Sequence, residues 1–458
     1  MGTRSGGFKD TDMTKGPIVK LLVLYAIPLL LGNLFQQLYN TVDSLVVGNF
    51  VGTQALAAIG STTCIVNTLV KFFNGVSIGA SVIISQYYGA HNDEDLHRSV
   101  ETTMALTFLC GILFTVLGYV MTPFMLRLMA TPYDVLPLSS LYLKIYFLGI
   151  SGLLVYNMGS GILRAVGDSK RPLLFLCFSS VLNIILDLLF VLAFRMGIAG
   201  VAIATILSQF ISAALILILL SRCTESYRFS WRELCLDSFL LKRILVVGLP
   251  TGIQQSLTAF SNVFVHSYIN AFGSSCMAGF SCYTKIDQFV MLPMQSMGNS
   301  ATMFVGQNVG AKDFKRAKKG SLTALGMAIF ITAGCCAVLW IFAPQLVKLF
   351  NKEEEVLYYG TLFLRLNCSF MVFCCFNQVF AGSLRGAGDA KAPMFYLLFS
   401  QVVCRQIYLF VISRIFPGNP CVISFGFPMG WMLCSVLMSV HYLRMDWENT
   451  AKKQNRKR

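Results

Sequence analysis

Two short groups of polar residues interrupt apolar stretches of the sequence and have the chemistry to bind a cation. Gln36, Asn40 and Asp43 follow at steps of four and three residues, a spacing that places all three on one face of a helix. Asn183 precedes Asp187 by four residues within a run of leucine and isoleucine. An ionised carboxylate with nearby amide oxygens binds a hard cation, and a carboxyl group shielded from water can take up and release a proton near neutral pH.

A hydroxyl group joins this set at Thr205, eighteen residues after Asp187. The two carboxylates of Asp43 and Asp187, with these amide and hydroxyl neighbours, are predicted to bind and release a proton or another cation. Besides this coupling ion, no metal site is predicted. The competing interpretation is that the two aspartates only hydrogen-bond neighbouring helices. We favour the ion site because a charge at the centre of a membrane helix costs at least ~2.5 kcal/mol.

Apolar helices must position these groups. Hydrophobic residues make up 55% of the 458 residues and charged residues 12%, against about 45–50% and about 25% in soluble domains. This composition excludes a soluble enzyme, and the lack of a Gly-x-x-x-x-Gly-Lys-Ser/Thr loop argues against ATP hydrolysis within the chain. The fifteen cysteines include no Cys-x-x-Cys pair, which argues against a zinc site or a disulfide framework. We predict no cofactor besides a coupling ion.

The apolar runs predict an all-α integral membrane protein with twelve spans, since one span needs about 20 apolar residues. Pro28 lies inside the first run and is predicted to bend it. The predicted spans cover residues 18–47, 54–86, 100–123, 136–160, 173–194, 198–220, 243–270, 275–308, 321–343, 356–383, 394–415 and 422–443.

The basic residues are distributed unequally between the two sides of these spans. With the N-terminus placed inside, 26 Lys and Arg lie on the cytoplasmic side and five on the other, while five lie within spans. Positive charge favours the cytoplasmic side, so both termini are predicted to be cytoplasmic. The net charge of +15 is thereby explained without a nucleic-acid partner.

An internal repeat divides the chain into two halves. Leu163–Pro172, which contains Gly-Asp-x-Lys, recurs at 384–393, and Gln86–Ala90 recurs at 307–311. The shift of 221 residues predicts two six-helix bundles in parallel orientation. We predict an N-terminal extension at 1–16, lobes at 17–220 and 243–443, a cytoplasmic linker at 221–242 and a basic tail at 444–458. Phe264 or Val265 and Tyr408 occupy the positions equivalent to the two aspartates, so ion coupling is predicted in the first lobe only.

A substrate site is expected between paired lobes of this kind. Methionine and aromatic side chains can form a flexible, polarisable wall for organic cations, although packing against lipid is the simpler explanation. The residues predicted to line the substrate cavity are Asn40, Asn157, Phe260, Phe289, Met291 and Met294. Lys285 and Asp287 are two residues apart and point to different faces, so Asp287 is expected to meet a basic residue of another helix.

These motifs together resemble the multidrug and toxic compound extrusion (MATE) family. The resemblance rests on the duplicated Leu-Arg-x-x-Gly-Asp-x-Lys-x-Pro, on Gln-x-x-Gly-Ala at the end of each second span and on Phe35-Gln-Gln-Leu-Tyr-Asn-Thr-Val-Asp43. It looks closest to the prokaryotic branch related to the DNA-damage-inducible transporters. The resemblance implies a V-shaped pair of bundles that opens to either side in turn and exports amphipathic or cationic compounds in exchange for H+ or Na+.

The resemblance also assigns roles to individual residues. Gln36, Asp43, Asn183, Asp187 and Thr205 match the family's cation site, and Pro28 matches the proline that bends the first span. The seventh span reads Gln254-Gln255-Ser-Leu-Thr258 and lacks the glutamate of another branch, which argues against a sodium site in the second lobe.

We therefore predict a secondary antiporter that exports organic compounds, and not an enzyme. A lipid-linked saccharide flippase of the same superfamily is the alternative, but it would need a cavity lined by Arg and Lys. A membrane-embedded enzyme would need clustered catalytic groups, and a channel fits the paired lobes less well. Expected partners are small organic substrates and membrane lipid, and the protein is expected to be a monomer in a bacterial plasma membrane.

Overall fold

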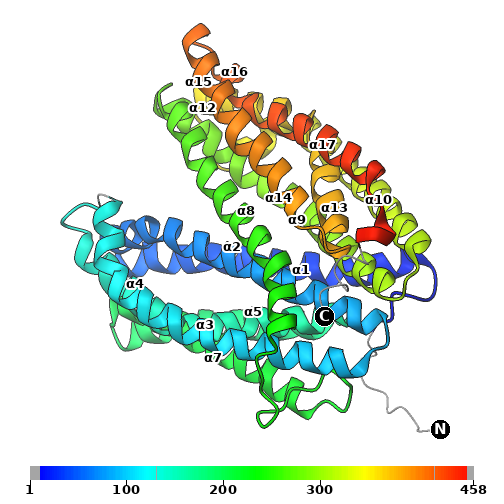
Figure 1. Cartoon of the computed structure of the whole chain (residues 1–458). Coiled ribbons are helices and arrows are strands. Elements are labelled where there is room, and N and C mark those ends of the chain that lie inside the picture. Colours follow the sequence, from blue (N-terminus) through cyan, green and yellow to red (C-terminus); the bar gives the residue numbers. More distant parts are fainter. Residues whose placement is uncertain (1–10, 130, 417, 451–458) are drawn as a thin grey trace. The chain divides into compact units, whose positions relative to one another are not determined.

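The computed structural model describes residues 11–129, 131–416 and 418–450, except for the side chains at positions 43–45, 49, 53 and 56. Every regular element in this part of the chain is a helix (Figure 1). The six predicted spans of the first half correspond to α1 (Ile18–Val46) with the π-helical turn η1 (Val47–Val51), α2 (Thr53–Gly89), α3 (Asp93–Leu128), α4 (Leu136–Leu148) with α5 (Ile150–Ala165), α6 (Lys170–Leu188) with η2 (Leu189–Ala193), and α7 (Gly197–Arg222).

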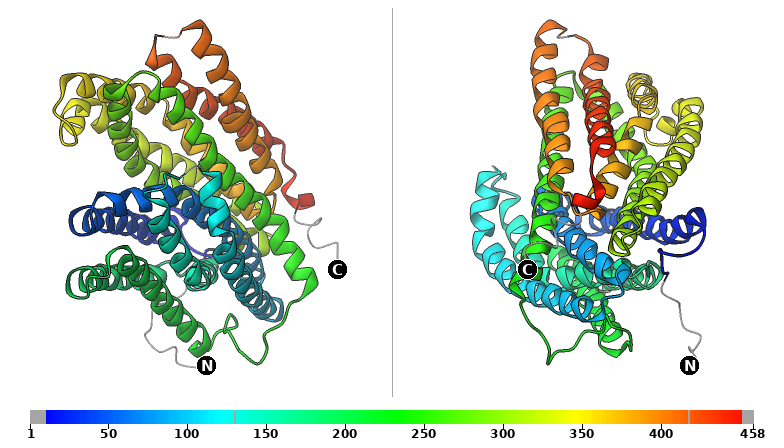
Figure 2. Two further views of the ribbon diagram at one scale, coloured as in Figure 1. Left: turned by 90° about the vertical axis from the view of Figure 1, so that its left-hand side faces the viewer. Right: turned by 45° about the vertical axis from the view of Figure 1, so that its right-hand side comes forward.

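The second half follows the same plan and contains one additional short helix, α11 (Ala343–Lys348). Its predicted spans correspond to α8 (Ser238–Asn270), α9 (Ser274–Gly310), α10 (Phe314–Ile341), α12 (Glu354–Cys368) with α13 (Val372–Gly386), α14 (Lys391–Leu398) with η3 (Phe399–Cys404) and α15 (Arg405–Ile415), and α16 (Pro420–Ser424) with α17 (Gly426–Arg444). Figure 2 shows these long helices from two further directions. The all-helical membrane fold is confirmed.

Not every helix of the structure is both long enough and apolar enough to count as a membrane span. Within the described residues, eight helices are long and apolar enough to cross a membrane, and two bent pairs raise this number to ten. The pairs α4–α5 and α12–α13 bend by 47° and 52°. Helices α8 and α9 are long enough, at 33 and 37 residues, but are rich in glutamine, serine and threonine. Ten of the twelve predicted spans thus meet the requirement on apolar character.

The chain forms two compact units whose division cuts two helices. Among the described residues, unit 1 contains Thr11, Asp12 and Leu31–Leu245, and unit 2 contains Met13–Leu30 and the residues from Val246 to Thr450. The first part of α1, up to Leu30, therefore belongs to unit 2. The boundary between the two units within α1 lies two residues after Pro28. The start of α8 conversely belongs to unit 1. The predicted lobe ranges did not include this exchange of helix ends, and they stay a prediction.

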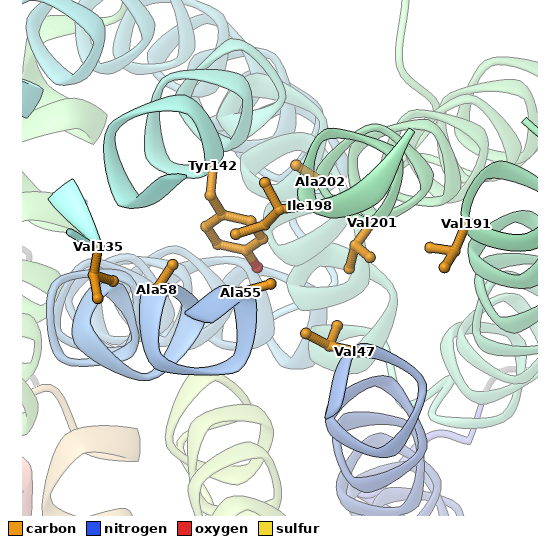
Figure 3. Close-up of a cluster of buried hydrophobic side chains, with 9 residues drawn as sticks. All are labelled: Val47, Ala55, Ala58, Val135, Tyr142, Val191, Ile198, Val201 and Ala202. Carbon is orange, nitrogen blue, oxygen red and sulfur yellow. The ribbon is translucent and has the colours of Figure 1, made fainter. Parts of the chain in front are cut away.

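Unit 1 is built around α5, which packs against α2, α3 and α7, while α6 packs along α7. One cluster of buried side chains joins η1, α2, α4, η2 and α7, and Figure 3 shows that most of its members are small or β-branched. It consists of Val47, Ala55, Ala58, Val135, Tyr142, Val191, Ile198, Val201 and Ala202. These contacts fix α7, and α6 is held by its packing along α7 and by its continuation in η2.

The repeated Gly-Asp-x-Lys motif forms a helix-connecting turn in both units. Gly167 and Gly388 both have φ +92°, a conformation that favours glycine. Asp168 Oδ1 accepts the backbone N–H of Lys170 and Arg171 at 3.0 and 3.1 Å and so caps α6. Burial raises the pKa of Asp168 above its usual value, and the hydrogen bonds from the α6 backbone oppose this effect.

Unit 2 is built around α9, which packs against α10, α12 and α13. Two glycines allow a close approach of α9 and α13. A Cβ atom added to Gly382 on α13 would lie 2.3 Å from the carbonyl oxygen of Gly298 on α9. Small residues permit this close packing of membrane helices.

We expect Gly382→Ala to destabilise the protein by about 1–3 kcal/mol, because the added methyl group forces α9 and α13 apart. Gly334→Ala on α10 is the matched control, since nothing lies within 4 Å of the added atom. Thermal unfolding of the purified variants in detergent measures both effects. Equal stability of the two variants would show that the α9–α13 contact is not as tight as described.

Candidate functional site

The polar residues predicted on the fifth and sixth spans are buried within unit 1. Asn183 and Asp187, one turn apart on α6, are 1% and 0% exposed. Thr205 on α7 is 4% exposed, and its hydroxyl donates a hydrogen bond of 3.0 Å to the carbonyl of Val201. Three residues of the predicted ion site are thus buried on two helices that pack against each other.

The environment of Asn183 argues against a purely structural role for this group. Neither its amide nitrogen nor its amide oxygen hydrogen-bonds any residue that the structure describes. A buried polar group without a partner costs about 1–3 kcal/mol, so an amide kept only to join helices would be expected to have one. An amide that binds a ligand needs hydrogen-bonding atoms that are not already occupied by the protein.

The residues predicted on the first span are placed differently. Gln36 and Asn40 are exposed on α1, and the side chain of Asp43 lies outside the described residues. Gly32, one turn before Gln36, is buried, and a Cβ atom added there would lie 3.6 Å from Leu173 and 3.7 Å from Leu176 of α6. The same face of α1 that carries the polar residues thus approaches α6 at Gly32.

The predicted substrate-cavity residues do not form one group. Asn40 and Asn157 belong to unit 1, where Asn157 is half-buried and its Nδ2 atom has no hydrogen-bond partner among the described residues. The other four belong to unit 2: Phe260 and Phe289 are 50% and 45% exposed, Met291 is half-buried and Met294 is 0% exposed. Met294 therefore packs in the interior of unit 2, while the two phenylalanines present free ring surface.

Sequence reasoning missed one buried cation of unit 2. Arg405, 2% exposed, follows the π-helical turn η3 and donates hydrogen bonds to Ser261 Oγ at 2.7 Å and Asn262 Oδ1 at 3.0 Å. Its guanidinium also lies 5.1 Å from the ring centroid of Phe427. The available signal was a charge within a predicted span, which is a default candidate for function.

The expectation for Asp287 was wrong. Among the described residues, Asp287 makes no ion pair with a basic side chain within 4.0 Å, and its Oδ1 atom is buried without a hydrogen-bond partner. Lys285 instead lies 5.6 Å from the ring centroid of Phe350. The two-residue spacing correctly predicted that Lys285 and Asp287 do not pair. The groups near Asp287 include the Tyr283 hydroxyl and the Cys374 thiol, where a basic partner was expected.

The repeated Gln-x-x-Gly-Ala motif anchors a segment that is distant in the sequence in each unit. In unit 1, Arg243 at the start of α8 donates hydrogen bonds to Gln86 Oε1 at 3.1 Å and to the Tyr87 hydroxyl at 2.5 Å. In unit 2, the backbone N–H of the fully buried Met13 donates to Gln307 Oε1 at 2.9 Å. These contacts hold the exchanged ends of α8 and α1 in place.

Comparison with known proteins identifies the family. The MatE family model matches residues 28–189 and again residues 250–411, so each half matches separately, at a shift of 222 positions. The chain belongs to the MATE family. This duplicated match agrees with the repeat found in the sequence, and the recognition of a MATE protein is confirmed.

Relatives of similar length support this assignment. The chain is 31% identical over 446 residues to the probable multidrug resistance protein YpnP of Bacillus subtilis (strain 168), covering 96% of this chain and 98% of the relative. It is 29% identical over 443 residues to the probable multidrug resistance protein YoeA of the same organism, covering 95% of each chain. A crystal structure of a MATE protein in the bent conformation has a TM-score of 0.89 at 24% identity, covering 97% of this chain and 98% of the other.

These findings establish the class of the protein. It is a multi-pass membrane transporter of small organic compounds and not an enzyme, as predicted from the sequence. Bacterial proteins are among its relatives.

Proposed function

We propose that this MATE transporter is a secondary antiporter that exports amphipathic or cationic organic compounds in exchange for H+ or Na+. The observation that carries the proposal is the buried pair Asn183 and Asp187 on α6, in which an acid lies beside an amide with unsatisfied hydrogen-bonding capacity. A carboxyl group enclosed by helices changes its affinity for a cation when its surroundings change. The names of the two Bacillus subtilis relatives support multidrug export as the function.

In this mechanism, Asp187 exchanges its bound cation as the transporter opens to each side. Gln36, Asp43, Asn183 and Thr205 complete the coupling site, and Asp43, Asn183, Asp187 and Thr205 would supply the ligands of Na+. A conformational change then alters which groups surround the acids. The bend at Pro28 supplies such a change, because the proline lies close to the division of α1 between the two units.

The alternative, a lipid-linked saccharide flippase, is less well supported. Recognition of a pyrophosphate requires several cationic side chains with free donors. The buried Arg405 donates from Nη2 to Ser261 and Asn262, and its Nε atom has no hydrogen-bond partner among the described residues, but a single arginine does not supply several cations. The polar groups left unsatisfied in unit 1 include an amide next to an acid. This arrangement favours a cationic ligand over an anionic one.

We further propose the finer assignments that follow from the sequence. The protein belongs to the prokaryotic branch related to the DNA-damage-inducible transporters, since Gln36, Asp43, Asn183, Asp187 and Thr205 match that branch. It acts as a monomer in the bacterial plasma membrane with both termini in the cytoplasm. The excess of basic residues on one side of the predicted spans supports this orientation.

Purified protein in liposomes tests the antiport proposal. An imposed proton gradient and an imposed sodium gradient are applied separately, and efflux of a fluorescent cationic dye is recorded together with internal pH or sodium. We expect one gradient to drive dye transport with counterflow of that ion. Ion flow without dye transport would indicate a channel, and dye movement independent of both gradients would contradict antiport.

The orientation gives a separate prediction, for which the exposed Cys235 of the linker is a natural probe. We expect a membrane-impermeant thiol reagent to label Cys235 only from the cytoplasmic side, and Cys235→Ser to remove this labelling. In the Cys235→Ser background, cysteines introduced at positions 92, 225 and 316 should also react only from inside. Cysteines at positions 131 and 418 should react only from outside, and the reverse pattern would overturn the orientation.

A further inference from the structure

The linker between the two repeats is packed against unit 1 rather than extended from it. The backbone N–H of Ser230 donates a hydrogen bond of 2.7 Å to Glu101 Oε1 of α3, and the ring of Trp231 stacks on Phe108 of α3 with centroids 5.3 Å apart. The backbone N–H of Phe229 donates to the carbonyl of Leu220 at the end of α7. The linker therefore has a defined course across α3 and α7.

Three potential metal ligands meet where the linker crosses α3. His97 and Glu101 lie one turn apart on α3, and Glu233 comes from the linker. One ligand atom from each side chain lies within 4.8 Å of the others. Among the residues that the structure describes, this is the one group of three histidine, cysteine or acidic side chains with such spacing.

The state of Glu101 indicates that this group receives a ligand. Glu101 is 1% exposed, and its Oε2 atom is buried without a hydrogen-bond partner among the described residues. A buried carboxylate is costly unless it is paired or coordinates a metal. Nearby, His97 Nε2 lies 2.8 Å from Glu233 Oε2, and their side chains are 31% and 62% exposed, which gives an ion a route of entry.

We infer that His97, Glu101 and Glu233 form a site for a divalent transition metal such as Zn2+, which fastens the linker to α3. One imidazole and two carboxylates suit zinc, and three protein ligands leave the fourth tetrahedral position for water. Zinc bonds of about 2.0–2.2 Å require the three ligand atoms to draw closer together. The exposed Glu233 side chain can make this movement. Ca2+ and Mg2+ fit less well because they prefer oxygen ligands.

The sequence argued against a zinc site because the cysteines lack the usual spacing. The inferred site contains no cysteine and joins His97 and Glu233, which are 136 positions apart, so no local sequence motif indicates it. It is independent of the proposed transport mechanism, because none of its residues belongs to the predicted ion or substrate sites. The equivalent positions in the second repeat are Lys318 and Leu322, so the site is specific to unit 1.

Zinc binding to the full-length protein tests the inference. The protein is purified in detergent, its affinity tag is removed, and it is stripped of metal before Zn2+ is titrated in competition with a chromogenic chelator. We expect one equivalent of Zn2+ to bind with micromolar affinity or better. His97→Gln, Glu101→Gln and Glu233→Gln should each weaken this binding by about tenfold or more. His97→Gln is chosen because glutamine can still donate a hydrogen bond to Glu233.

Two nearby substitutions serve as matched controls. His91→Asn and Glu94→Gln remove exposed groups from the same region, and asparagine tolerates the φ of +51° found at His91. Both controls should bind Zn2+ as the wild type does. Absence of saturable binding to the wild type, or equal binding by all three ligand variants, would overturn the inference.

Limited proteolysis measures the effect on the linker. Trypsin can cleave after the exposed Arg228 and Arg232. Zn2+ should slow this cleavage in the wild type and in His91→Asn but not in His97→Gln, which also controls for any effect of zinc on the protease. Equal slowing in His97→Gln would show that zinc does not act through this site.

Discussion

Replacing Asp187 with asparagine is expected to abolish gradient-driven efflux while the protein still folds and binds substrate. Asparagine has nearly the same shape as aspartate, so the packing of α6 against α7 should persist around this fully buried position. It carries no charge and cannot bind and release a proton or attract Na+. Coupling of substrate movement to an ion gradient is therefore lost, although the substrate site is intact.

The measurement compares dye efflux from proteoliposomes with dye binding to the same protein in detergent. Asp43→Asn is expected to have the same effect, on the basis of its position in the sequence. Asp134→Asn is the matched control, because Asp134 is exposed in the connection between α3 and α4. Efflux at the wild-type rate by Asp187→Asn would remove this residue from the mechanism, whatever the result for Asp43.

The sequence predicted those features that leave a local or periodic signal. Apolar runs located all twelve long helical segments, and the repeat of 221 residues agrees with the duplicated family match. Polar residues inside apolar runs correctly predicted the burial of Asn183, Asp187 and Thr205. Helix ends were less well predicted, since α3 begins at Asp93 and not at residue 100. The Asn92 side chain caps this first turn, which is polar and helical and so lacks an apolar signal.

Contacts between distant segments could not be predicted in the same way. The hydrogen bond between Met13 and Gln307 joins positions 294 residues apart, and only the fold brings them together. The exchanged ends of α1 and α8 depend on such contacts, so a division of the sequence into two consecutive lobes does not reveal them. Arg405 likewise appears in the sequence as an isolated charge, and its partners Ser261 and Asn262 become evident only when α8 and α15 meet.

The exchange of helix ends gives Pro28 a specific mechanical position. Residues before Leu31 in α1 belong to unit 2, and the rest of α1 belongs to unit 1. If the angle between these two parts of α1 changes, the helix must bend near Leu30. A proline weakens the helix close to this position, because Pro28 lacks the N–H that would bond to the carbonyl of Leu24. Pro28 is thus placed where a hinge between a straight and a bent helix would act.

Pro28→Ala is therefore expected to slow transport more than it weakens substrate binding. Alanine restores the missing hydrogen bond and removes a helix penalty of about 3 kcal/mol, which favours the straight form of α1. A shift of about 1.4 kcal/mol already changes a two-state equilibrium tenfold, so we expect efflux to fall by about tenfold or more. Dye affinity should change much less, because substitution at Pro28 leaves the predicted cavity residues in place.

Pro123→Ala in α3 is the matched control, since Pro123 also lies inside a long helix but entirely within unit 1. It should leave the efflux rate close to that of the wild type. Efflux rate and dye affinity are measured on both variants after thermal unfolding has shown that they are folded. Unchanged turnover in a folded Pro28→Ala protein would mean that Pro28 is a fixed feature of α1 and that alternation between the two sides does not depend on its bending.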